Sequence, residues 1–94
     1  MKEKDETFWH MLGGVRWLIV PKCKKLRCCK GETDFANKEI RIGHKVKGEL
    51  LIDTIVHDGM EARLPFLAHD QIEGAASEIA SLLVKCGVRV IEEE

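Results

Sequence analysis

One stretch in the middle of the chain decides the expected fold: Leu50-Leu-Ile-Asp-Thr-Ile-Val-His-Asp-Gly-Met-Glu-Ala62. Its apolar residues recur at steps of three and four, which is the spacing of a helix with one buried face. These residues are Leu51, Ile52, Ile55, Val56 and Gly59. The pattern begins after Lys47 and Gly48, and Pro65 closes it because proline cannot continue a helix. The stretch therefore predicts an amphipathic helix.

A second helix is expected to follow. Asp70 is predicted to cap its N-terminus, with Glu73 three positions later completing a capping box. The apolar residues beyond them form one stripe at helical spacing, and Gly87 ends it. The stripe consists of Ile72, Ala75, Ala76, Ile79, Leu82, Leu83 and Cys86. Cys86 is therefore expected to be a small buried residue.

The residues before Lys47 favour strands. Val15–Val20 is rich in β-branched and aromatic residues, and Glu39–Gly43 alternates polar with apolar residues, as a half-buried strand does. Leu26–Lys30 is a further candidate strand. The other expected elements are a short or frayed helix over 2–12, a loop over 32–38 and a short last strand over 88–91.

These elements predict an α+β fold in the order (α)βββααβ. A three-stranded sheet, with or without a short fourth strand at the C-terminus, is expected to pack against two helices. A chain of 94 residues has room for one small domain. The expected divisions are an N-terminal extension or short helix over 1–14, one domain over 15–91 and an acidic tail over 92–94.

Composition and charge exclude several classes of protein. Hydrophobic residues make up 45% and charged residues 33%, which is typical of a globular chain and not of a disordered or collagenous one. The formal net charge of −1 conceals a split: ten basic and three acidic residues over 15–47, then three basic and ten acidic over 48–94. The apolar runs are too short to span a bilayer, and the N-terminus does not resemble a signal peptide. We therefore expect a cytoplasmic protein whose four cysteines are reduced thiols.

The central helix carries a row of metal-capable side chains. Residues four apart lie one above the other on a helix, so Asp53, His57 and Glu61 share one side of it. Two such side chains can reach one cation together, which is the geometric basis of the H-E-x-x-H motif of zinc peptidases. The corresponding residues here are His57-Asp58-Gly59-Met60-Glu61.

The order of motifs resembles that of small SprT-like, zincin-type metallopeptidases, many of them encoded by phages. The matching features are an I-x-I strand, the run before the motif, a Leu-Pro loop and a last helix followed by G-x-R. In this chain they are Glu39-Ile-Arg-Ile, Val46-Lys-Gly-Glu-Leu-Leu-Ile-Asp-Thr-Ile-Val-His, Ala62, Leu64-Pro65 and Cys86-Gly-Val-Arg. The resemblance spans roughly 15–90 and implies a zincin-like fold that binds zinc and acts on a protein or peptide.

The resemblance also implies roles for individual residues. His57 stands at the first zinc ligand, Asp58 at the general base and Glu61 at the second ligand, a position where a carboxylate can also bind zinc. Aspartate is one methylene shorter than the glutamate of the motif, which predicts impaired catalysis. Candidates for the third ligand are His69, Asp70 and Glu73, of which His69 and Glu73 are favoured. Asp53 is expected to hydrogen-bond the outer nitrogen of His57.

Other interpretations compete with the metal site. A His and a Glu four residues apart also form ordinary surface pairs. His69 fits an exposed loop residue equally well, and Glu73 fits the capping box. The alternative function is a catalytically inactive interaction module of phage or mobile-element origin.

The basic segment and its cysteines allow two further hypotheses. Five basic residues could contact the phosphates of a nucleic acid, namely Lys22, Lys24, Lys25, Arg27 and Lys30. A solvated strand edge is favoured instead, because the segment has no aromatic residue on which a base could stack. Cys23, Cys28 and Cys29 lack the paired spacing of a structural zinc site, so one of them is expected to pack in the core.

Overall fold

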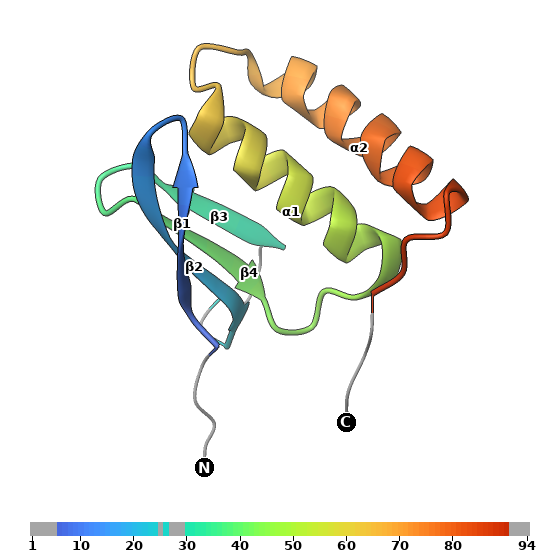
Figure 1. Cartoon of the computed structure of the whole chain (residues 1–94), viewed down its shortest axis with the longest axis horizontal. Helices are drawn as coiled ribbons and strands as arrows, with labels where there is room; N and C mark the ends of the chain where they lie inside the picture. The colour runs from blue at the N-terminus through green and yellow to red at the C-terminus, as the bar shows by residue number, and fades with distance from the viewer. Residues whose placement is uncertain (1–5, 25, 27–29, 91–94) are drawn as a thin grey trace.

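The computed structural model describes residues 6–24, 26 and 30–90. They form one four-stranded mixed sheet and two helices, so the expected α+β class is confirmed. The elements are β1 (Phe8–Leu12), β2 (Val15–Cys23), β3 (Gly31–Asp34), β4 (Glu39–Gly43), α1 (Gly48–Arg63) and α2 (His69–Lys85). Figure 1 shows three layers, with α1 lying between the sheet and α2.

The sheet has the order β1-β2-β4-β3. β1 and β2 form an antiparallel hairpin closed by Gly13 and Gly14, whose φ angles of 62° and 78° match a type I′ turn. β2 and β4 are parallel, with Ile19 opposite Ile40. β3 pairs antiparallel with β4 and forms the other edge.

One face of the sheet builds the core. Side chains alternate between the two faces of a strand, so Trp17, Ile40 and Ile42 all point toward α1. They pack there against Ala62, and each of the four is at least nine-tenths buried. The ring of Trp17 also meets Phe35 edge to face, with the ring centroids 5.7 Å apart.

Helix α1 contacts the sheet and α2 at once, whereas α2 contacts only α1 among the described elements. The sheet-facing row of α1 is Thr54, Asp58 and Ala62, spaced four apart and all buried. α2 buries Ile72, Ala76 and Ala80, and the alanines allow the two helix backbones to approach closely. Because the layers are stacked in this order, one side of α1 lies between β3 and α2.

The sheet has four strands and not the expected three. The predicted short helix near the N-terminus is wrong over Phe8–Leu12, which is β1. Its apolar and aromatic residues lead directly into the two-glycine turn, and this hairpin signal outweighs the helical interpretation. The strand Glu39–Gly43 is confirmed, and the strand begun at Val15 continues through Pro21 to Cys23.

Two further predictions near β3 and the C-terminus are wrong. Gly31–Asp34 is a strand, although its polar residues predicted part of a loop, because pairing with β4 satisfies its backbone. Residues 88–90 form no strand, and Ile91 lies outside the described residues. Most of the candidate strand Leu26–Lys30 also lies outside them, while Leu26 and Lys30 themselves are not in a strand.

The helix bounds agree with the sequence except at the start of α2. Ala68, not Asp70, precedes its first turn, and the Gln71 side chain accepts a hydrogen bond from the Ala68 N–H at 3.0 Å. The predicted pairing of Asp70 with Glu73 as a capping box is therefore wrong. Gly87 ends the helix with a φ of 99°, as expected.

The two cysteines within the described residues differ in burial. Cys23 is buried, whereas Cys86, which follows the last residue of α2, is exposed, so its predicted burial is wrong. Cys28 and Cys29 lie outside the described residues. Neither helix of the described chain is long and apolar enough to cross a membrane.

Candidate metal centre

Three side chains converge beside the C-terminal half of α1. His57 and Glu61 lie one turn apart on α1, and His69 is the first residue of α2. The loop over 64–68 reverses the chain, so the start of α2 returns alongside the last turns of α1 (Figure 1). This reversal brings His69 next to a pair that is only four residues apart in the sequence.

The distances suit one cation. Glu61 Oε2 lies 3.2 Å from His57 Nε2 and 3.6 Å from His69 Nδ1. One ligand atom from each residue can be chosen so that all three lie within 4.8 Å of one another. Tetrahedral zinc with bonds of about 2.1 Å separates its ligand atoms by about 3.4 Å. The His57, Glu61 and His69 group could therefore hold a metal ion with small side-chain adjustments.

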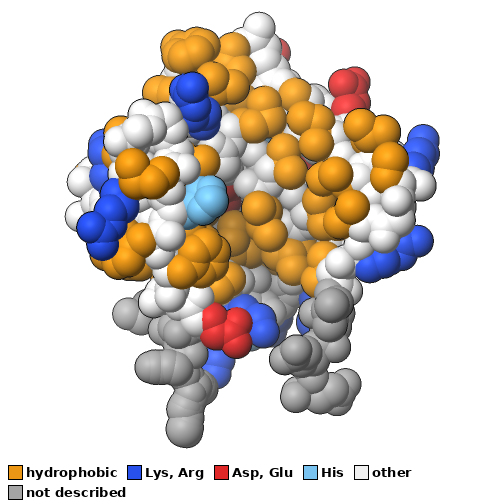
Figure 2. Space-filling model, in the orientation of Figure 1, with side chains coloured by type: hydrophobic (Ala, Val, Ile, Leu, Met, Phe, Trp, Pro, Cys, Tyr) orange, Lys and Arg blue, Asp and Glu red, His pale blue; other side chains and the backbone are white. Residues whose placement is uncertain are grey.

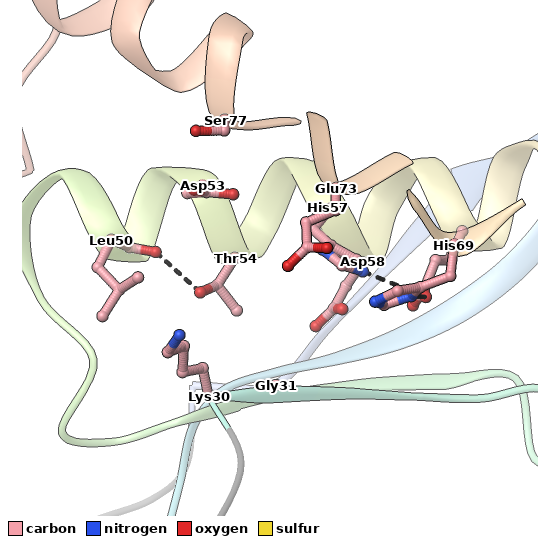
Figure 3. A pocket seen from close by; sticks show the side chains of 11 residues that line it. Lys30, Gly31, Leu50, Asp53, Thr54, His57, Asp58, His69, Glu73 and Ser77 are labelled. Atoms are coloured by element: carbon pink, nitrogen blue, oxygen red, sulfur yellow. Dashed lines mark hydrogen bonds and ion pairs between the residues drawn. The ribbon is translucent and has the colours of Figure 1, made fainter. Parts of the chain in front are cut away.

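The group opens into a pocket of about 380 Å³ between α1, α2 and the start of β3 (Figure 3). His69 stands at its rim with two-thirds of its side chain exposed, whereas the side chains of His57 and Glu61 are about one-fifth to one-quarter exposed. A cation held there would be reachable from solvent, with room for a water or a substrate group beside it. Structural zinc sites, in contrast, are closed by four protein ligands.

Thr33 holds the carboxylate of Glu61 in place from the sheet. Its hydroxyl donates a hydrogen bond to Glu61 Oε1 at 3.0 Å, which leaves Oε2 facing the two imidazoles. Sequence reasoning missed Thr33 because it lies 28 residues before Glu61 in a segment expected to be a loop. The I-x-I pattern of β4 was the available signal, since a neighbouring antiparallel strand places Thr33 opposite Ile40.

Asp58 lies behind the group, only 5% exposed, on the sheet-facing row of α1. Its Oδ2 has no hydrogen-bond partner in the described structure. Burial, followed by repulsion from the Glu61 carboxylate, raises the pKa of Asp58 to about 7, against the opposing effect of the neighbouring His57. A buried carboxyl with an unpartnered oxygen costs folding free energy, so Asp58 is a candidate functional residue.

Gly31 makes room for Asp58. A Cβ atom at this position would overlap Asp58 Oδ2 and approach Thr54 Cγ2 to 2.8 Å. Figure 3 shows Asp58 lying between α1 and the strand that carries Gly31. A glycine is therefore required here by close approach, since a larger residue would push β3 away from the site. Gly59 on α1 differs, because open space surrounds it.

The remaining candidate residues lie at different distances from the group. Glu73 lines the same pocket from α2, and Asp53 lines it from α1, but neither belongs to the group of three. Asp70 is exposed and does not line the pocket. The expected hydrogen bond from Asp53 to His57 does not occur in the described structure, where His57 Nε2 instead faces Glu61.

The basic segment is described only in part. Lys22, Lys24 and Lys30 are exposed, and Lys25 and Arg27 lie outside the described residues. Lys22 is 4.0 Å from Glu6, and Lys30, immediately before β3, lines the pocket beside the candidate metal group (Figure 3).

Comparison of the chain with models of protein families, with curated proteins and with solved structures finds no match. Two imidazoles and one carboxylate form a donor set of borderline softness, suited to zinc and other divalent transition metals more than to calcium or magnesium.

Proposed function

We propose that this protein is a zinc-binding domain of the zincin type, with His57, Glu61 and His69 as ligands and a hydrolytic site beside them. The observation that carries the proposal is the convergence of these three side chains at the rim of an open pocket. Catalytic zinc sites typically combine three protein ligands with one open position, and sets of two histidines and one glutamate occur among them. The SprT-like resemblance of the sequence points to the same class, with a peptide as substrate.

The residues around the ligands would have distinct tasks. Thr33 would orient the Glu61 carboxylate through its hydrogen bond. Asp58, immediately after the first ligand and lining the pocket, would accept a proton from a water held there. Bound zinc would supply the Lewis acidity that polarises such a water or a substrate carbonyl. Glu73 lines the same pocket from α2 and would be the alternative third ligand if His69 did not bind the metal.

Metal binding is tested first. The full chain, purified without chelators, is titrated with zinc by calorimetry, and its melting temperature is recorded with zinc and with EDTA. We expect one zinc per chain and a rise in melting temperature, because a ligand that binds only the folded state stabilises it. His57→Ala should abolish both effects, while the matched variant His10→Ala, an exposed histidine on β1, should retain them. An unchanged titration in His57→Ala would contradict the proposed ligand set.

Catalysis is tested separately with a mixture of fluorescent peptides and an unfolded protein as substrates. Zinc-dependent cleavage that disappears in His57→Ala and falls steeply in Asp58→Asn would support a peptidase. Zinc binding without cleavage would favour the catalytically inactive interaction module. A third ligand is distinguished by comparing His69→Ala with Glu73→Ala: the larger loss of zinc affinity is expected for His69→Ala, because only His69 lies within the group.

A further inference from the structure

The strand β1 has an unprotected outer edge. It is the last strand of the sheet, and no strand of the described chain pairs with its outer side. Natural edge strands are usually protected by charged residues, proline or a bulge, and Phe8–Leu12 has none of these. Phe8, Trp9 and Met11 are 48%, 55% and 57% exposed. β1 therefore offers an apolar surface on both faces beside an edge that is able to pair.

The turn of the hairpin determines which backbone groups face outward. A two-residue type I′ turn closes on a hydrogen-bonded pair, which here is Leu12 with Val15. Bonding alternates along an antiparallel strand, so His10 and Phe8 also direct their N–H and C=O groups toward β2. Trp9 and Met11 direct theirs away from the sheet. The outer edge of β1 thus presents two donors and two acceptors.

We propose that β1 pairs antiparallel with β1 of a second copy of this chain, around a twofold axis that passes through His10. In this register, the backbone N–H and C=O of Trp9 form two hydrogen bonds with the backbone of Met11 of the second copy. Met11 forms the same two bonds with Trp9 of the second copy. Phe8 lies opposite Leu12 on one face, and Trp9 lies opposite Met11 on the other. The two sheets become one continuous sheet of eight strands.

The position of the helices supports a second copy of the chain as the partner that pairs with β1. A twofold axis through paired edges stands perpendicular to the sheet, so both helical layers lie on the same face of the joined sheet. Ile55 is two residues before His57, and at about 100° per residue it points to the opposite side of α1 from the pocket. Ile55 and Leu82 are 52% and 59% exposed, and hydrophobic side chains gather over this part of the molecule (Figure 2). These side chains would face their counterparts across the axis.

The area that pairing would bury approaches that of a stable dimer interface. Six half-exposed apolar side chains, contributing on the order of 100 Å² each, would bury roughly 600 Å² per copy before the strand backbone is counted. A standard stable interface buries about 800 Å² per partner. The strand has no Lys, Arg, Asp or Glu, so self-pairing brings no like acidic or basic side chains into opposition. The six residues are Phe8, Trp9, Met11, Ile55, Ile79 and Leu82.

The test measures the mass of the full chain by sedimentation equilibrium from about 1 to 200 µM. EDTA is included so that metal bridging between copies cannot contribute. We expect a species of twice the 10.7 kDa chain mass. Met11→Lys and Ile55→Lys should each weaken association at least tenfold, because each places a charge in the interface. Leu50→Lys is the matched control, since Leu50 is 43% exposed on the pocket side of the same helix.

A crosslinking variant keeps the proposal testable if Met11→Lys does not fold. His10 would meet its counterpart in a non-hydrogen-bonded pair, where Cα atoms are about 4.5 Å apart and a disulfide can form. His10→Cys should therefore give a dimer linked through the introduced thiols on mild oxidation, as located by peptide mapping. Val15→Cys on the inner strand should not. A monomer at 200 µM, or a dimer insensitive to Met11→Lys and Ile55→Lys, would overturn the proposal.

Discussion

Helix α1 has two unlike sides. Toward β3 and the start of α2, it presents His57, Glu61 and the buried Asp58, which contact one another and Thr33. On the opposite side, toward β1, it presents Ile55, which is 52% exposed. On the first side, polar groups lie in a buried environment, which is unfavourable for them. On the second side, apolar groups are exposed to water, which is also unfavourable.

Neither the buried carboxyl of Asp58 nor the exposed side chain of Ile55 adds to the stability of an isolated chain. A buried carboxylate with an unpartnered oxygen costs free energy unless a ligand or proton compensates it. Exposed apolar side chains contribute little to folding unless a partner covers them. The pocket side is therefore expected to respond to pH and metal, and the β1 side to protein concentration.

The largest effect is expected for Asp58→Asn. A pKa raised from 3.8 to about 7 means that folding disfavours the charged form, at a cost of up to about 4 kcal/mol at pH 8. The variant removes this charge and should stabilise the metal-free protein above pH 7, by up to that amount. Denaturant unfolding with EDTA at several pH values measures the change.

The sign of the pH dependence provides the control. At pH 3 the carboxyl is protonated in both the folded and the unfolded state, so the variant and the parent should be equally stable. As the pH rises from about 4 to about 7, the parent loses stability because only its unfolded state releases the proton readily. Asp53→Asn, in the same pocket, should leave that pH profile unchanged. A parent protein with no such loss would contradict the burial argument for Asp58.

A smaller effect is expected for Gly31→Ala. The added methyl group would overlap Asp58 and crowd Thr54, and overpacking of this kind costs about 1–3 kcal/mol. Displacement of β3 would also move Thr33 and weaken zinc binding. Gly59→Ala is the matched control, since nothing surrounds that position and alanine favours a helix by about 0.5–1 kcal/mol. Equal stability changes in the two variants would show that Gly31 is not constrained by close approach.

Thr33→Val should affect the metal more than the fold. Loss of a hydrogen bond that orients a metal ligand typically lowers affinity about 10–100-fold. Calorimetric titration with zinc measures this loss, and Thr33→Ser should restore most of the affinity because it keeps the hydroxyl. Full affinity in Thr33→Val would mean that Glu61 is positioned without the sheet.

The smallest effect is expected for Ile55→Ser on the opposite side of α1. At low protein concentration, the free energy of unfolding should change by no more than about 0.5 kcal/mol, as is usual for exposed positions. Thermal unfolding at about 1 µM measures this change, with Ile42→Ala as the buried reference expected to cost about 2–5 kcal/mol. A loss above about 1 kcal/mol in Ile55→Ser would show that this side is covered within the monomer.

Much of the helical half could be predicted from the sequence. The three- and four-residue spacing predicts α1, and the turn signals of Pro65 and Gly87 lie close to the observed helix ends. The β-rich half was harder. β1 is apolar on both faces without a clear two-residue period, and β3 is polar, so neither pattern distinguishes a strand from its alternatives.

The site divides in the same way. The placement of His57 and Glu61 on one side of α1 follows from their spacing of four residues, because helix geometry is local and repeats along the chain. Only the tertiary structure decides that His69 and Thr33 meet that pair and that Gly31 lies against Asp58, since these contacts depend on the reversal after α1 and on the register of β3. Local sequence therefore determined the helix and the pair of candidate ligands on it, whereas packing between distant segments decided the position of the third candidate, His69, and the burial of Asp58.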